Sequence, residues 1–438
     1  MITVIQLLGG KGTRLEGITR GKIAKPLVPL NNMSIVERQI NHLIKFGCKN
    51  FIWVCFHMKE DFEIEKIKLI EKYKSQIESI TIFSEKLPLS TFGSLYGVVN
   101  TCKEKEFLVL YGDIIVNFDL YRFVCDFRKF EDSDTHIFTR YSNHPEDSDK
   151  IQIDNNSYVS RFISKEEISQ DSDPPTTTSG IYLARKIFFE KLIHWSGQKC
   201  DLYSEVLPID GHLIKASAYQ SSEFILDVGT LKRYRDAEII LKNNSFYSTS
   251  YLFQRPALLL DRDGVVIKEN GYIDNIQKII FNEDLIKIMS ILKKRNILVG
   301  IITNQPLIAQ GRLNYSNHVK IKNFIINYLA KSSAIDFYYE CLHYPKTGYQ
   351  DEVPFYKKSC YCRKPKTGLI QKSIHHHNID LTKSIFIGDN ETDIIAGRSS
   401  LIKSFFYNFS SGDLFQLNKE HKKNTIKNVN NILDLFKK

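Results

Sequence analysis

The chain lacks the features that mark membrane and secreted proteins. No apolar run approaches the roughly 20 residues that a helix needs to span a bilayer. The first residues include neither a basic leader nor a small-residue cleavage site, and Val4–Leu8 has the pattern of a β-strand instead. We therefore expect a cytoplasmic protein with no membrane partner.

Signatures of nucleic-acid binding are also lacking. The formal net charge is +10, but the lysines are dispersed among Ile and Asn, and no arginine-rich block or RNA-binding motif is present. A basic protein that handles phosphorylated small molecules needs no polyanion. We expect small-molecule substrates and no nucleic-acid partner, and the sequence is compatible with an oligomer.

The length of 438 residues exceeds one ordinary core, because domains usually have about 100–200 residues. Strand and helix patterns alternate from residue 4 to 140 and again from residue 257 to 406. Such alternation is typical of mostly parallel sheets with helices on both faces. We expect an α/β protein of two domains, 1–240 and 256–438, joined by a polar linker at 241–255.

The eight cysteines indicate free thiols or a metal site rather than disulfides in such a chain. Four of them stand in apolar settings and are interpreted as packing residues: Cys48, Cys55, Cys102 and Cys125. Cys341-Leu342-His343 and Cys360-Tyr361-Cys362 form two tight pairs of ligands, as in a closed, structural Zn²⁺ site. The alternative is two unrelated thiol pairs.

A glycine-rich loop, Gly9-Gly10-Lys11-Gly12-Thr13-Arg14, follows the first strand. Its glycines let backbone N–H groups approach a polyphosphate closely, and Arg14 adds a fixed cation. The loop lacks the G-K-[ST] ending of a Walker A motif and the spacing of a dinucleotide fingerprint. It predicts phosphate binding of another kind, with an ordinary glycine turn as the alternative.

Further motifs follow the glycine loop in a fixed order: Lys25-Pro26-Leu27, Pro88–Leu95, Leu110–Asp113, Thr178–Tyr182 and Leu226–Thr230. Together they resemble the sugar-1-phosphate nucleotidyltransferases over residues 2–237. The resemblance implies a Rossmann-like, GT-A-like domain that joins a sugar 1-phosphate to a nucleoside triphosphate and releases pyrophosphate. That reaction depends on charge neutralisation and positioning more than on acid–base catalysis.

The resemblance also implies roles for individual residues. Asp113 and Asp227 would hold Mg²⁺, Arg14 would contact the leaving phosphates, and Lys25 the reacting one. The substrate-binding positions would be Gly9, Gly10, Gly12, Thr13, Lys165 and Gly180.

Five positions depart from the family pattern: Leu8, Ser90, Phe92, Ser94, and Ser164, which stands where a glutamate is usual. They leave the predicted metal carboxylates unchanged but affect base selection and the fit of the sugar. A non-catalytic sugar-nucleotide-binding domain is therefore the alternative for this half.

The second half opens on the apolar run Leu258–Leu260, which ends in Asp261-Arg262-Asp263-Gly264. In parallel α/β sheets, chemistry collects at the carboxyl ends of strands. One carboxylate could attack there and the other move a proton, with an acidic turn as the alternative. Thr303-Asn304, Lys364 and Gly388-Asp389 follow in order.

These four motifs resemble the haloacid-dehalogenase-like phosphatases over residues 256–406, which implies a Rossmannoid domain. Asp261 would be the nucleophile that forms an aspartyl phosphate, and Asp263 would protonate the leaving alcohol and then activate water. Thr303, Asn304 and Lys364 would hold the phosphoryl group. The Mg²⁺ ligands would be Asp261, the backbone carbonyl of Asp263, and Asp389, while Asp393 would support the metal shell.

The Cys/His spacing together with Arg363-Lys364-Pro365 resembles a narrower group, the heptose bisphosphate phosphatases and their histidinol-phosphate relatives. In that group Arg363 would contact the distal phosphate or the sugar. The run His375-His376-His377 lies in a polar helix end and is expected at the solvated surface.

The two halves are compatible with one pathway. Removal of the 7-phosphate from D-glycero-D-manno-heptose 1,7-bisphosphate leaves heptose 1-phosphate, which a nucleotidyltransferase consumes. We expect a bifunctional enzyme that makes an NDP-heptose for a bacterial surface polysaccharide, with GTP as the donor. The alternatives are another sugar 1-phosphate, or a phosphatase for histidinol phosphate.

Overall fold

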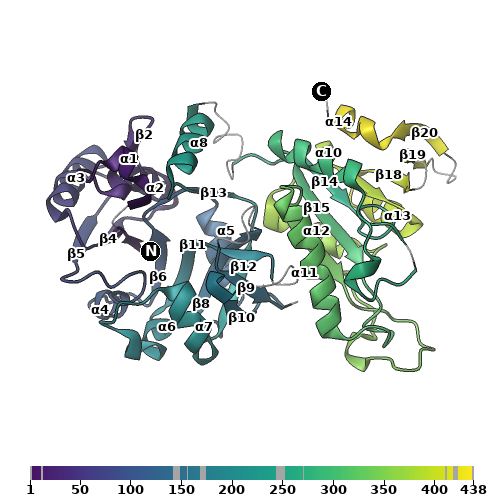
Figure 1. Cartoon of the computed structure of the whole chain (residues 1–438), viewed down its shortest axis with the longest axis horizontal. Coiled ribbons are helices and arrows are strands. Elements are labelled where there is room, and N and C mark those ends of the chain that lie inside the picture. Colours follow the sequence, from purple (N-terminus) through teal and green to yellow (C-terminus); the bar gives the residue numbers. More distant parts are fainter. Residues whose placement is uncertain are drawn as a thin grey trace. The chain divides into compact units, whose positions relative to one another are not determined.

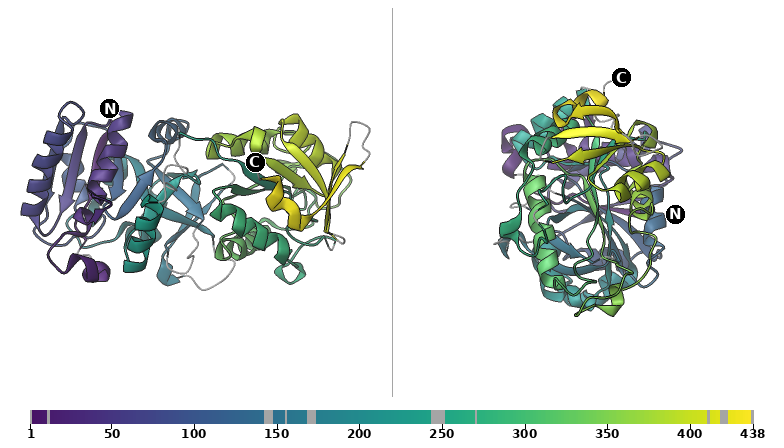
Figure 2. Two further views of the ribbon diagram at one scale, coloured as in Figure 1. Left: turned by 90° about the horizontal axis from the view of Figure 1, so that it is seen from above. Right: turned by 90° about the vertical axis from the view of Figure 1, so that its right-hand side faces the viewer.

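The structure is a computed structural model that describes residues 2–10, 13–141, 148–154, 156–167, 174–242, 252–269, 271–409, 412–417 and 423–436. The chain divides into two compact units, described separately below (Figures 1 and 2). The first comprises Met1–Arg140, Ser148–Ile168 and Thr176–Tyr251, and the second Tyr141–Asp147, Ser169–Pro175 and Leu252–Lys438. The linker predicted at 241–255 falls at this division, and its residues 243–251 lie outside the described part of the chain.

The first unit is built on a mixed sheet in the order β10-β9-β11-β6-β1-β4-β5, with β8 beside β11 and β12 beside β8. The central strands β6, β1, β4 and β5 are parallel, and β11 is antiparallel to β6. The strands are β1 (Thr3–Leu7), β4 (Asn50–Cys55), β5 (Ser79–Ser84), β6 (Glu106–Tyr111), β8 (Thr135–Tyr141), β9 (Lys150–Ile153), β10 (Val159–Ile163), β11 (Thr176–Arg185) and β12 (Ala216–Gln220).

Both faces of this sheet are buried. Val4 and Ile5 are neighbours on β1 but pack into different hydrophobic clusters, because successive residues of a strand face opposite sides. The apolar run of β1 is therefore continuous rather than alternating. The helices of the unit are α1 (Glu16–Thr19), α2 (Ile35–Leu43), α3 (Lys59–Lys72), α4 (Leu95–Asn100), α5 (Leu120–Phe127), α6 (Lys186–Lys191), α7 (Leu207–Asp210) and α8 (Leu231–Lys242).

Two small antiparallel pairs complete the unit. They are β2 (Pro29–Leu30) with β3 (Met33–Ser34), and β7 (Ile114–Asn117) with β13 (Phe224–Asp227).

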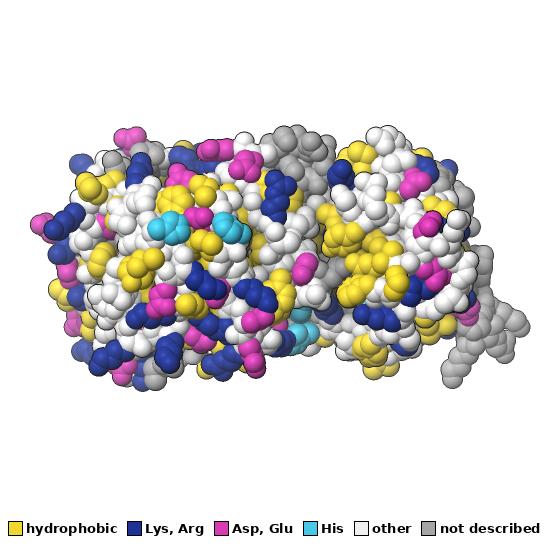
Figure 3. Space-filling view, turned by 90° about the horizontal axis from the view of Figure 1, so that it is seen from below, with side chains coloured by type: hydrophobic (Ala, Val, Ile, Leu, Met, Phe, Trp, Pro, Cys, Tyr) yellow, Lys and Arg dark blue, Asp and Glu magenta, His cyan; other side chains and the backbone are white. Residues whose placement is uncertain are grey.

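On the face shown in Figure 3, basic and acidic side chains are interspersed over the surface.

The second unit has a sheet in the order β16-β15-β14-β17-β18-β19-β20. The first five strands are parallel and the last two form antiparallel pairs. The strands are β14 (Ala257–Leu260), β15 (Leu298–Asn304), β16 (Phe337–Cys341), β17 (Ile385–Gly388), β18 (Lys403–Asn408), β19 (Asp413–Leu417) and β20 (Lys423–Asn428), and the helices are α10 (Glu283–Lys294), α11 (Tyr315–Lys331), α12 (Gly368–His377), α13 (Glu391–Ser399) and α14 (Ile432–Leu435).

Strand β14 lies at the point where the direction of the strand order reverses. The chain proceeds from β14 to β15 and β16 on one side, and returns to β17 and β18 on the other. Ligands of open α/β sheets bind at the carboxyl ends of the strands at such a switch point. The fold therefore places Asp261, directly after β14, at the expected site.

The histidine run at the end of α12 is only partly solvated, and in this respect the expectation from sequence was wrong. His375 is exposed, but His377 is buried, its ring stacks on Phe337 at 4.1 Å, and it lies 2.9 Å from the Tyr339 hydroxyl. Phe337 and Tyr339 come from β16, so a strand distant in sequence covers this histidine.

Among the described helices, none has the length and apolarity of a membrane span.

Candidate active sites

The first unit contains a cavity of about 510 Å³ at the carboxyl ends of β1 and β6. Gly9, Gly10, Arg14, Lys25 and Asp113, all predicted from the sequence, line it. Thr91 and Tyr111 line it as well and belong to the motifs Pro88–Leu95 and Leu110–Asp113, although no role was predicted for them; Glu85 and Lys199 also line it and lie outside every motif. Gly12 and the side chain of Thr13 lie outside the described residues.

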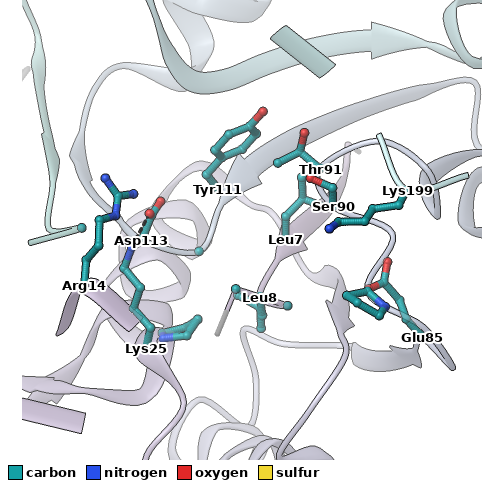
Figure 4. Close-up of a pocket in the computed structure, with 16 residues that line it drawn as sticks. Leu7, Leu8, Arg14, Lys25, Glu85, Ser90, Thr91, Tyr111, Asp113 and Lys199 are labelled. Atoms are coloured by element: carbon teal, nitrogen blue, oxygen red, sulfur yellow. Dashed lines mark hydrogen bonds and ion pairs between the residues drawn. The ribbon is translucent and has the colours of Figure 1, made fainter. Parts of the chain in front are cut away.

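Lys25 and Asp113 form an ion pair in this cavity. Lys25 Nζ lies 2.5 Å from Asp113 Oδ2, and Lys25 is only 8% exposed. Figure 4 shows the two side chains pointing toward each other, with Arg14 on the same side of the cavity. Gly112 permits this arrangement, because a Cβ there would lie 2.7 Å from the Leu7 carbonyl oxygen.

Asp227 reaches the same place from the end of β13. The pairing of β13 with β7 continues in a hydrogen bond of 2.9 Å from Val228 N to the Asp113 carbonyl. A Cβ at Gly229 would lie 2.7 Å from Asp227 Oδ1 and 3.3 Å from Lys25 Nζ, so the two carboxylates converge around Lys25. Arg233 Nη1 lies 2.7 Å from Asp227 Oδ2. The sequence motifs did not predict a role for Arg233.

Two converging carboxylates supply the oxygen ligands that Mg²⁺ prefers. In this structure a basic side chain neutralises each of them: Lys25 for Asp113 and Arg233 for Asp227. The two carboxylates therefore fit a divalent cation, which would replace part of the positive charge that Lys25 and Arg233 now supply.

Lys165 and Gly180 are not among the described residues that line this cavity. Lys165 is exposed, and its backbone N–H donates to Asp149 Oδ1 at 3.0 Å. Gly180 has φ +75°, and a Cβ there would lie 3.1–3.3 Å from the Tyr111 side chain, so Gly180 supports a cavity wall. Ser164 is buried, and its hydroxyl accepts a local hydrogen bond from Glu166 N.

The second unit contains a cavity of about 810 Å³ at the carboxyl end of β14. Seven residues predicted from the sequence line it: Asp261, Asp263, Asn304, Arg363, Lys364, Asp389 and Asp393. Thr303, also predicted, is buried, and its hydroxyl accepts a hydrogen bond of 2.9 Å from Gln305 Nε2.

Lys364 bridges two buried carboxylates. Its Nζ lies 2.8 Å from Asp261 Oδ1 and 2.6 Å from Asp393 Oδ1, and the residue is 3% exposed. Asn304 fixes the backbone of Lys364, with its Nδ2 donating to the Lys364 carbonyl at 3.1 Å and its Oδ1 accepting from Lys364 N at 3.0 Å. Asn304 thus helps to position Lys364 beside Asp261.

The carboxylates of Asp261, Asp389 and Asp393 crowd together, with oxygens within 4.8 Å of one another. Burial raises the pKa of Asp261 to about 6 against the effect of Lys364. Burial, with the Asp261 charge second, raises the pKa of Asp389 to about 8. Crowded carboxylates that resist ionisation are suited to a divalent cation, so the residues present fit Mg²⁺.

Gly264 makes this crowding possible. It has φ +73°, and a Cβ there would lie 1.8 Å from Asp389 Oδ2. The glycine of the D-x-D-G motif is therefore needed both for the turn and for the approach of Asp389.

The Asp263 carboxylate is held by two side chains that the sequence did not single out. Arg262, 2% exposed, donates from Nε to Oδ1 and from Nη2 to Oδ2, both at 2.9 Å. Gln305 Nε2 donates to Oδ2 at 2.7 Å. These three hydrogen bonds fix the orientation of Asp263 beside the cavity.

The four predicted zinc ligands come together, with their ligand atoms within 4.8 Å of one another. They are Cys341, His343, Cys360 and Cys362, and no disulfide joins these thiols. The hydrogen bond between Cys362 and Cys341 is the largest cause that lowers the pKa of the Cys362 thiol to about 5. Thiolates and a histidine nitrogen in one cluster fit Zn²⁺.

Two family models of known proteins match different parts of the chain. The family model described as nucleotidyl transferase matches residues 3–244, which is more than half of the chain, and a model described as HAD-hydrolase-like matches residues 361–431.

Curated relatives match the second unit. A D-glycero-alpha-D-manno-heptose-1,7-bisphosphate 7-phosphatase of Campylobacter jejuni is 33% identical over 186 residues, which cover 41% of this chain and 95% of the relative. One from Photorhabdus laumondii is 34% identical over 149 residues, which cover 34% of this chain and 79% of the relative.

A solved structure, HddC from Yersinia pseudotuberculosis, covers 55% of this chain and 100% of its own, with 22% identity and a TM-score of 0.45. The family assignment rests on the sequence matches. The chain belongs to the nucleotidyl transferase family through its first unit and carries a haloacid-dehalogenase-like phosphatase domain in its second, and it is therefore a bifunctional enzyme.

Proposed function

We propose that this enzyme makes a nucleotide-activated heptose in two steps. The phosphatase unit removes the 7-phosphate of D-glycero-D-manno-heptose 1,7-bisphosphate, and the transferase unit joins the resulting heptose 1-phosphate to a nucleoside triphosphate. One observation carries the proposal: a match over 95% of the length of a heptose bisphosphate 7-phosphatase lies in the same chain as a nucleotidyl transferase domain. The product of the first reaction is the substrate of the second.

In the phosphatase step, Asp261 attacks the 7-phosphorus and forms an aspartyl phosphate. Lys364, 2.8 Å from Asp261, neutralises charge on the phosphoryl oxygens, and Thr303 donates to one of them. Asp263 gives a proton to the leaving oxygen of the sugar and then takes one from the attacking water. Asp261, Asp389 and the Asp263 carbonyl would hold Mg²⁺, which would supply further charge neutralisation.

In the transferase step, an oxygen of heptose 1-phosphate attacks the α-phosphorus of the nucleotide, and pyrophosphate leaves. Lys25 neutralises the reacting phosphate and Arg14 the leaving phosphates, while the backbone of Gly9 and Gly10 allows their close approach. Asp113 and Asp227 would hold Mg²⁺, which would screen the charges on the phosphates. We propose GTP as the donor.

The proposal also covers the Cys/His cluster, the cellular compartment and the use of the product. The Cys/His cluster would bind Zn²⁺, which would fix the loop that carries Arg363 and Lys364. We place both reactions in the cytoplasm, because nucleoside triphosphates are supplied there, and we propose that the product serves a bacterial surface polysaccharide.

The position of the remaining phosphate tests the first step. Purified enzyme, Mg²⁺ and heptose 1,7-bisphosphate without nucleotide should give heptose 1-phosphate, identified by ³¹P NMR from the coupling of its phosphorus to the anomeric proton. Accumulation of heptose 7-phosphate would contradict the proposal, because that product cannot enter the second step.

A further inference from the structure

The phosphatase cavity has cations on its wall that no carboxylate neutralises. Arg363 and Lys346 both line the cavity, and within the described ranges neither forms an ion pair with a carboxylate. The other two basic residues of the wall differ, since Lys364 pairs with Asp261 and Arg262 with Asp263. The unneutralised charge suits a second anionic group on the substrate, apart from the one that reacts.

Arg363 is held in the wall by neutral groups. Its Cζ lies 4.8 Å from the ring centroid of Tyr344, and its Nη1 donates to the His343 carbonyl at 3.1 Å. A guanidinium over an aromatic face is attracted by the ring quadrupole, and its charge is not cancelled by this contact. The remaining N–H groups of Arg363 are therefore available to an anion.

Tyr344 is itself one member of a series in which aromatic rings and cations alternate. Lys357 Nζ lies 5.3 Å from the Tyr344 ring and 5.5 Å from the Tyr349 ring, and the two rings meet edge to face at 5.8 Å. Arg312 Cζ lies 5.1 Å from Tyr349 and 4.3 Å from Tyr272. We name the six residues the cation–aromatic wall: Tyr272, Arg312, Tyr349, Lys357, Tyr344 and Arg363.

The backbone under this wall is closely fitted. Val353 N donates to the Ala309 carbonyl at 3.2 Å. Gly311 has φ +72°, and a Cβ there would lie 1.7 Å from the Asp351 carbonyl oxygen. The segment after β15 and the loop between the two Cys/His pairs are therefore packed directly on each other, which fixes the backbone that carries Arg312 and Tyr349.

We propose that Tyr344 is a specificity-determining positioning residue: its ring holds the Arg363 guanidinium where it binds the second phosphate, and so selects doubly phosphorylated sugars. The inference rests on the proposed phosphatase function and deepens it. Tyr344 acts through Arg363 and touches none of the reacting atoms. Its loss should therefore raise KM for a bisphosphate and leave the chemical step unchanged.

The test compares Tyr344→Leu with the matched variant Tyr344→Phe, which keeps the ring and loses only the hydroxyl. Steady-state phosphate release is measured with heptose 1,7-bisphosphate and with heptose 7-phosphate, which lacks the second phosphate. For Tyr344→Leu, KM for the bisphosphate should rise about tenfold, with kcat for both substrates and KM for the monophosphate within about twofold of wild type. Tyr344→Phe should behave as wild type.

Four outcomes would overturn the inference. Equal losses on both substrates in Tyr344→Leu would show a general structural role, and unchanged kinetics would show no role. A wild-type enzyme that hydrolyses heptose 7-phosphate and the bisphosphate with equal kcat/KM would overturn the proposed selection of doubly phosphorylated sugars but leave the phosphatase function intact. Release from neither substrate would overturn the proposed function as well.

Discussion

Lys364 Nζ lies 2.8 Å from the Asp261 carboxylate, and Lys364 itself is almost wholly buried. The same ammonium lies 2.6 Å from Asp393. Burial by itself lowers the pKa of Lys364, but the nearby carboxylates of Asp261 and Asp393 outweigh it and keep the pKa above its ordinary value. One buried cation thus compensates two carboxylates. Stability and phosphate release should depend on it together.

Lys364→Met should lower the free energy of unfolding by about 3–5 kcal/mol, because it leaves buried carboxylates without a counter-charge. Chemical denaturation measures the change. The double variant Lys364→Met with Asp393→Asn should recover part of the stability but none of the phosphate release, since the Asp261 nucleophile still lacks its cation. Equal stability of wild type and Lys364→Met would contradict the assigned pairing.

Asp113→Ala should remove pyrophosphate release when heptose 1-phosphate and nucleotide are supplied directly. The change deletes a proposed Mg²⁺ ligand and the partner of Lys25, and we expect a loss of about 10³-fold or more. Phosphate release from the bisphosphate should stay unchanged. Asp236→Ala, an exposed aspartate on α8 of the same unit, is the control, and a similar loss in that variant would argue against a specific role for Asp113.

Cys360→Ser should reduce bound zinc from about one ion per chain to near zero, measured by metal analysis of the purified protein. Phosphate release should fall with it, because the Cys/His cluster holds the loop that ends in Arg363 and Lys364. Cys125→Ser changes an exposed thiol of the first unit and should retain both zinc and activity. Full phosphate release without zinc would refute the structural role of the metal.

Glu223→Gln should alter how the stability of the transferase unit depends on pH. Glu223 is buried and accepts hydrogen bonds from Asp119 N and the Ser221 hydroxyl, and burial raises its pKa from 4.5 to about 7. The folded state therefore holds the proton more tightly than the unfolded state, and the stability contributed by the protonated group is lost as pH rises from about 4.5 through 7.

Over that interval the wild type should lose about 3 kcal/mol relative to Glu223→Gln, at roughly 1.4 kcal/mol per pKa unit. Denaturant titrations of both proteins at pH 4.5 and pH 8 measure the difference. Parallel stability profiles would mean that Glu223 titrates in the folded protein as it does in the unfolded chain.

The sequence predicted features that depend on local pattern. The run Leu258–Leu260 is apolar throughout because both faces of β14 are buried, so a strand ending at Asp261 could be recognised directly. The same holds for β1 and its glycine loop. The four Cys/His ligands could be recognised because their spacing within each pair is short.

Features that depend on contacts between distant segments could not be predicted. Arg262 lies inside the D-x-D-G motif, but its hold on Asp263 is completed by Gln305, 42 residues later. The stacking of Arg312 on Tyr349 likewise joins two separate loops. His377 was expected at the surface because its neighbours in sequence are polar, whereas Phe337 and Tyr339 bury it.

The most direct test of the central claim is a one-pot reaction. Enzyme, Mg²⁺ and heptose 1,7-bisphosphate are mixed with each of the four nucleoside triphosphates, and phosphate and pyrophosphate are followed together. We predict that phosphate appears with all four and that pyrophosphate follows with GTP. Asp261→Asn should abolish both, and added heptose 1-phosphate should restore pyrophosphate release but not phosphate release. Phosphate without pyrophosphate from any nucleotide, or pyrophosphate from Asp261→Asn without added heptose 1-phosphate, would contradict the two-step account.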